Sequence, residues 1–176
     1  HRRGDKGRDR SFPFPILGIR DRDWSKIFYG AGLVHNNFRG RNEKLFGSFT
    51  LGYDPSVTVA YRNSFLDEEG NWFMDARSSY NRIRNKSPQV EAAYGEYEER
   101  HFSVLANVGR RLGRYHSVWL SGGYKLVHAS VDSVVTTISA DGRDQFPVLG
   151  AGYLYDTRDL LEYPSHGTMA GATFQK

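Results

Sequence analysis

Apolar and polar residues alternate over most of this chain, and the alternation predicts β-strands that each have one apolar and one polar face. The clearest run places Val57, Val59 and Tyr61 on one face and Arg62 on the other. Turn residues such as Pro55 separate the runs. The predicted strands cover residues 11–19, 26–38, 44–53, 56–65, 71–83, 99–112, 115–131, 148–155 and 168–175.

The predicted strands are long, and their polar faces carry charges. They run to roughly 10–13 residues, whereas strands of globular sheets usually have about 5 or 6. Arg62, Asp75, Arg77 and Lys125 fall on the polar faces, where they suit a water-filled lumen. Short turns and longer loops alternate between about nine strands. We therefore predict an all-β fold, an antiparallel up-and-down transmembrane β-barrel surrounded by membrane lipid.

The remaining segments define the organisation of the chain. Residues 1–10 hold five Lys or Arg and two Asp, which predicts a charged linker or arm. Residues 11–176 are then expected to form part of the barrel domain. Residues 84–98 and 133–144 are expected to be loops, the second with a small hairpin at Asp141-Gly142. Residues 146–175 are expected to form the last hairpin, where Pro164 and Gly167 mark the entry into its second strand.

Composition narrows the function classes. The chain has no cysteine, so disulfide frameworks and thiolate metal sites are excluded. A net charge of +4 is too mixed to indicate a nucleic-acid binder. The six histidines are scattered, and no nucleophile elbow, P-loop or zinc-protease motif occurs. We expect no enzyme activity, no catalytic residues, no metal and no cofactor.

Two motifs resemble one family. Asn36, Asn37, Phe38 and Gly40 resemble the second-strand exit of the bacterial surface antigen superfamily, an Asn-aromatic-x-Gly-x-Gly run in which Asn42 here replaces the last Gly. The sequence from residue 156 to 167 resembles the family's mid-barrel hairpin, through Asp156, Arg158, Asp159, Pro164 and Gly167. The family includes the BamA and TamA assembly proteins and the Sam and Toc translocases, and the resemblance covers residues 12–176.

The resemblance implies a barrel of sixteen strands in the outer membrane of a Gram-negative bacterium or of an organelle, preceded by periplasmic domains. It implies that this chain is the amino-terminal part of the barrel, and that the protein inserts or translocates unfolded outer-membrane protein clients. The first strand would then form one side of a lateral gate, through the residues Phe12, Phe14, Ile16, Leu17 and Gly18. Two prolines, Pro13 and Pro15, confine this strand to an edge, a bulge or a strand start.

Alternatives remain open at this point. A passive outer-membrane pore or structural barrel would have the same alternation. A soluble β-sandwich or lipid-binding barrel would instead pack its aromatic faces inward. An open half-barrel would also leave unpaired strand edges, through which copies of the chain are expected to associate. Strand glycines such as Gly30, Gly32, Gly150 and Gly152 are expected to relieve crowding or allow bending.

Overall fold

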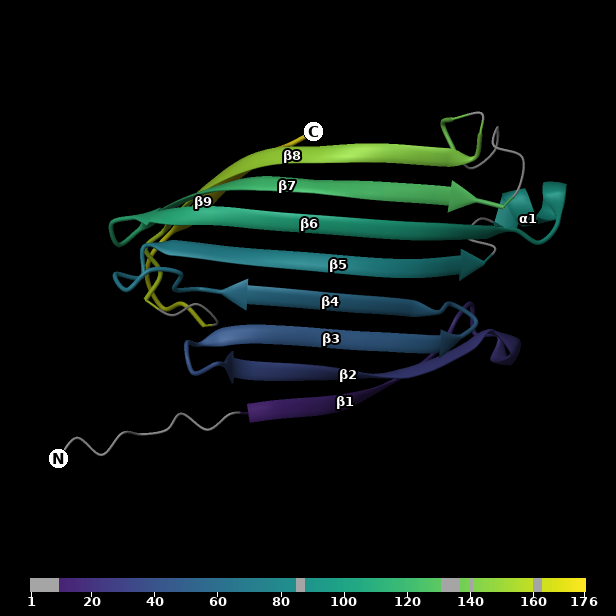
Figure 1. The fold of residues 1–176 in the computed structure, drawn as a ribbon, viewed down its shortest axis with the longest axis horizontal. Helices are drawn as coiled ribbons and strands as arrows, with labels where there is room; N and C mark the ends of the chain where they lie inside the picture. The colour runs from purple at the N-terminus through teal and green to yellow at the C-terminus, as the bar shows by residue number, and fades with distance from the viewer. Residues whose placement is uncertain (1–9, 85–87, 131–136, 140, 160–162) are drawn as a thin grey trace.

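The chain forms one open, nine-stranded antiparallel sheet in which every strand pairs with its neighbours in sequence (Figure 1). The computed structural model describes residues 10–84, 88–130, 137–139, 141–159 and 163–176. The strands are β1 (Arg10–Ile19), β2 (Ile27–Phe38), β3 (Glu43–Gly52), β4 (Ser56–Asn63), β5 (Trp72–Arg84), β6 (Glu98–Leu112), β7 (His116–Ala129), β8 (Arg143–Asp156) and β9 (Met169–Gln175). The predicted all-β, antiparallel up-and-down architecture is confirmed, and β1 and β9 are the two edges of the sheet.

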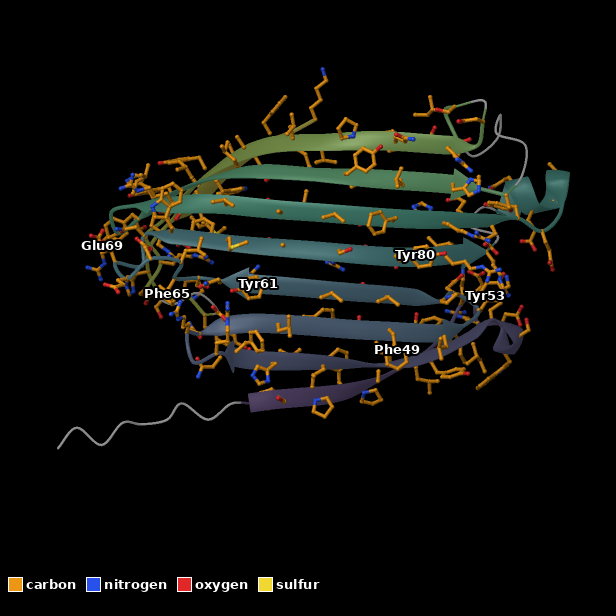
Figure 2. The ribbon with its side chains drawn as sticks, in the orientation of Figure 1. Phe49, Tyr53, Tyr61, Phe65, Glu69 and Tyr80 are labelled. Atoms are coloured by element: carbon orange, nitrogen blue, oxygen red, sulfur yellow. The ribbon has the colours of Figure 1, made fainter. Side chains whose placement is uncertain are left out.

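The connections lie at two opposite ends of the sheet. We call the end with residues 39–42, 64–71, 113–115, 157–159 and 163–168 the turn end, and the other the loop end. The loop end carries a short 3-10 helix (Trp24–Lys26) and the helix α1 (Pro88–Tyr94). Figure 2 shows Phe65 and Glu69 at the turn end and Tyr53 at the loop end.

Several predicted boundaries are wrong in detail. The expected loop 84–98 contains α1, a helix of seven residues that begins at Pro88, a residue favoured at the first helical position. β4 ends at Asn63, whose side chain accepts a hydrogen bond from the amide of Phe65 and turns the chain. β8 begins at Arg143 rather than at residue 148, since β7 continues far enough to pair with it. Residues 1–9 of the expected charged arm and residues 133–136 lie outside the described residues, and Arg10 belongs to β1.

The strand register joins the alternating faces into two continuous surfaces. The surface we call the outer face is apolar and well exposed, with Leu120 and Leu149 both 70% exposed. One row across it joins Val57, Tyr80, Phe102 and Leu126. The opposite surface, the inner face, carries the polar partners of the same strands. Buried apolar side chains are few among the described residues, namely Tyr97, Ala129 and Val148, so no packed interior core holds this sheet together.

Aromatic rings lie over glycines on the inner face. The Phe14 ring covers Gly32, where an added Cβ would lie 2.2 Å from the ring Cζ, and Trp119 covers Gly152 in the same way. At Gly30 an added Cβ would lie 1.9 Å from the Phe49 carbonyl oxygen of the neighbouring strand. The expectation that the strand glycines relieve crowding is therefore met, because at these positions a side chain would collide with a ring or with backbone.

Candidate functional site

The first candidate is the edge strand β1, the expected gate strand. Along its whole length β1 pairs with β2, from Arg10 opposite Asn36 to Ile19 opposite Ile27. The structure places Phe12, Phe14, Ile16 and Gly18 on the inner face and Leu17 on the outer face, where Leu17 is 79% exposed. The Phe14 ring also stacks on Phe46, with their centroids 6.1 Å apart. The free edge is thus apolar on both faces.

The second-strand exit forms a tight turn in which several residues adopt left-handed backbone conformations. Asn37, at φ +65°, coincides with a register shift between β2 and β3, and its side chain accepts a hydrogen bond of 2.8 Å from the Asn42 amide. Gly40 has φ +74° and donates its amide to the Asn37 carbonyl. Asn42 has φ +57°, a region that Gly and Asn tolerate best, which explains why Asn can stand where the motif that it resembles has its last Gly.

A buried carboxylate supports this turn. Glu43 has no exposed surface, and Arg39 donates two hydrogen bonds of 2.9 Å to its two oxygens. Arg39 also reaches the Tyr61 hydroxyl, and Asn63 donates to Glu43 from β4. Sequence reasoning missed Glu43. The sequence shows that Glu43 follows Arg39 by four residues. It does not show that Asn63, twenty residues further along the chain, donates to the same carboxylate.

The residues of the hairpin motif lie at the two ends of the connection between β8 and β9 and hydrogen-bond to each other there. The Arg158 guanidinium donates two hydrogen bonds, of 2.9 and 2.8 Å, to the two carboxylate oxygens of Asp156. This pairing raises the pKa of the guanidinium. Asp159 accepts hydrogen bonds from the amides of Ser165 and His166. Gly167 has φ +106°, and an added Cβ would lie 2.4 Å from the Thr157 carbonyl oxygen. Pro164 lies in the connection itself, so the motif residues define the return of the chain.

A cavity at the turn end is lined both by residues of the hairpin motif and by residues from the middle strands of the sheet. Its volume is about 570 Å³, and its lining includes Asp156, Arg158, Asp75, Asn107 and Arg111. These residues come from β5, β6 and β8 and from the β8–β9 connection, so the sheet curls around its inner face. Asn107 donates a 2.7 Å hydrogen bond to Asp75. The lining is mixed: the rings of Phe73 and Trp119 lie beside the carboxylates and guanidinium groups that face the inner side.

Arg111 is a second residue that sequence reasoning did not single out for a role. Its guanidinium donates to the carbonyl oxygens of Ser64 and Gly70, at 2.8 and 2.7 Å, and lies over the rings of Phe65 and Phe73. It therefore holds the β4–β5 turn against the inner face. The carbonyls that it binds lie more than forty residues away in sequence, so no local pattern marks this contact.

The predicted lumen charges are partly brought together. Arg62 lies directly opposite Asp75, and both line a hollow with Arg77 on the inner face. Lys125 lies on the same face but on β7, opposite Ser103, away from that hollow. Within the described part of the chain, no three His, Asp or Glu side chains are grouped to hold a metal ion, and no helix is long and apolar enough to span a membrane.

Comparison with known proteins gives a likeness in fold. No protein-family model matches the chain, and no curated protein matches it by sequence. A solved structure, BamA from Haemophilus ducreyi lacking POTRA domains 1–3, superposes with a TM-score of 0.56 at 17% sequence identity. The match covers 94% of this chain and 33% of that one, so the chain spans about a third of the protein it resembles. The nine-stranded sheet thus has the fold of part of a BamA barrel.

Proposed function

We propose that this chain is part of an outer-membrane β-barrel that assembles other outer-membrane proteins by pairing their strands with β1. The observation that carries the proposal is the continuous apolar outer face, which ends at an unpaired edge strand. Leu17 on the edge and Leu120 in the middle of the sheet are 79% and 70% exposed, values that suit lipid contact rather than water. The likeness to part of a BamA barrel supports the same proposal.

The physical role of the edge follows from hydrogen bonding. A client strand that enters hydrocarbon with unpaired backbone groups incurs a cost of several kcal/mol for each group. The free side of β1 offers donors and acceptors that satisfy such a strand. Pro13 and Pro15 remove two donors from β1, which limits the stability of any pairing and favours its release. Insertion of clients is the task we propose, with translocation as the related alternative.

The membrane part of the proposal is tested with the whole protein, refolded in the presence of lipid vesicles. We expect the protein to float with the vesicles and to change its gel mobility on boiling, because a closed barrel resists detergent until it is heated. A soluble protein that stays at the bottom of the gradient would overturn the membrane proposal and favour a β-sandwich or a soluble lipid-binding barrel.

The assembly part is tested by photo-crosslinking in cells. A photoreactive residue at Leu17 is expected to crosslink to newly made outer-membrane proteins, since Leu17 lies on the free edge. The matched control is the same residue at Leu120, on the same face and similarly exposed but flanked by β6 and β8. Equal client crosslinking at both positions would reject pairing at the edge. Crosslinks at Leu17 only to a second copy would indicate self-association instead.

Depletion of the protein distinguishes assembly from a passive pore. An assembly factor should lower the abundance of several other outer-membrane proteins when it is lost, because unassembled clients are degraded. A pore or structural barrel should leave those proteins at normal abundance.

A further inference from the structure

A second polar hollow lies at the loop end, on the outer side of the sheet. Its volume is about 390 Å³, and its lining includes Tyr53, Arg82, Arg84, Glu98, Arg100 and Ser130. The register pairs Arg82 with Arg100, and Arg84 with Glu98. Two residues before Arg82 and two after Arg100, Tyr80 and Phe102 lie opposite each other on the apolar outer face. The hollow therefore lies immediately beyond the apolar surface.

Two arginines in this hollow share one carboxylate. Arg100 Nε donates to Glu98 Oε1 at 2.7 Å, and Arg82 Nη2 pairs with the other oxygen of Glu98. Arg82 Nε is buried and has no hydrogen-bond partner among the described residues. Glu98 thus holds two guanidinium groups side by side while neutralising one charge, and a buried donor remains unsatisfied.

Further cations gather around Tyr53 beside this pair. The charged groups of Arg20, Lys26 and Arg84 lie 5.8, 5.7 and 5.8 Å from the centroid of the Tyr53 ring. Arg20 pairs with Asp54 at 3.0 Å, and Lys26 pairs with Asp21 at 3.2 Å.

The backbone of Arg84 is fixed by the same group. Its carbonyl accepts a hydrogen bond from Arg20, and its amide donates to Asp54. The Arg84 side chain is thereby positioned at the hollow.

The acidic groups do not cancel this charge within the hollow. Three arginines line it, namely Arg82, Arg84 and Arg100, against the two carboxylates of Glu96 and Glu98. Guanidinium groups are planar donors that bind phosphate through two parallel hydrogen bonds. A hollow with this donor set, open beside an apolar surface, fits a molecule that has both an anionic phosphate and acyl chains.

We propose that this loop-end hollow binds the phosphate of an anionic membrane lipid, with the acyl chains lying on the outer face over Tyr80 and Phe102. The inference rests on the proposed membrane location. Basic clusters next to a hydrocarbon-facing surface attract anionic headgroups, whereas a free phosphate ion would gain nothing from the apolar side. Binding fixes the loop end of the barrel at one depth in the bilayer.

The test uses the whole protein, folded in zwitterionic detergent micelles and titrated with dioleoylphosphatidic acid or dioleoylphosphatidylcholine. Native mass spectrometry measures the lipid that stays bound. We expect phosphatidic acid to bind at least about tenfold more tightly than phosphatidylcholine, and the double variant Arg84→Gln/Arg100→Gln to lose about that factor. The matched control, Arg41→Gln/Arg110→Gln, removes the same charge at the turn end and should retain the preference.

The outcomes separate this inference from the proposed function. Heat-modifiable gel mobility first establishes that each variant is a folded barrel, and failure of the wild-type protein there would overturn both. A folded wild-type protein without lipid preference, or equal losses in the two double variants, would overturn the inference alone. Arg84→Lys/Arg100→Lys keeps the charge and should lose only part of the affinity. Inorganic phosphate that competes as well as the lipid would reject a role for the acyl chains.

Discussion

The outer and inner faces of this sheet are built from the same strands, but their side chains are stabilised in different ways. The side chains of Leu120 and Leu149 on the outer face are apolar and 70% exposed, so the surrounding medium determines which side chains are stable there. The inner face holds Asp75 with its partner Asn107, and rings that lie on glycines. The outer face should therefore be sensitive to charge and tolerant of volume, and the inner face the reverse.

The largest expected effect comes from a charge on the outer face. In the folded protein in lipid vesicles, Leu120→Arg should lower the free energy of unfolding by about 2–4 kcal/mol, because lipid cannot solvate the guanidinium. Ser121→Asp places a charged group of small volume one residue further on, on the inner face, and should cost at most about 1 kcal/mol. Denaturant titration measures both. An equal loss in the free energy of unfolding for the two variants would mean that both faces are exposed to the same medium.

A methyl group on the inner face should have the next largest effect. At Gly123 an added Cβ would lie 2.4 Å from the Val104 carbonyl oxygen, whereas at Gly122, on the outer face, no atom lies within 4 Å. Gly123→Ala should destabilise the folded protein by about 1–3 kcal/mol, since backbone has to move. Gly122→Ala should be neutral or stabilise by up to about 1 kcal/mol. The same titration applies, and a loss at Gly122 as large as at Gly123 would contradict the difference in space between the faces.

The smallest effect concerns coupling between neighbouring strands. Asp75 and Asn107 are opposite each other and hydrogen-bonded, so a double-mutant cycle to alanine should give a coupling of about 1 kcal/mol. Met74 and Val108 are the adjacent opposite pair on the outer face, and their cycle should give a smaller coupling, because lipid chains replace the lost contacts. A larger coupling for Met74 and Val108 would show that side-chain packing, rather than lipid, stabilises the outer face.

The strands themselves could be predicted from the sequence. Alternation at Val57, Val59 and Tyr61 is a local property of the chain, because successive side chains of any extended strand point to opposite sides. An edge position for β1 was one of the predicted possibilities, since Pro13 and Pro15 confine a strand to an edge, a bulge or a strand start. The hairpin around Asp156 and Gly167 could also be predicted from the sequence, because its contacts join residues that are close together along the chain. The alternation could not predict the helix α1, since a helix of seven residues is too short to show a clear periodic pattern.

What only the tertiary structure decided depends on register and curvature. Glu43 is buried where Asn63 of β4 donates to it, and Arg111 binds carbonyls of the turn that leads into the neighbouring strand β5. The pairing of rings with glycines, the cavity that joins Asp156 to Asp75, and the gathering of Arg82, Arg84 and Arg100 all follow from which residues stand opposite each other. The sequence alone determined the strands and their faces, because alternation is local. The sites were decided by the tertiary structure, because a shift of one residue in register would turn every side chain to the other face.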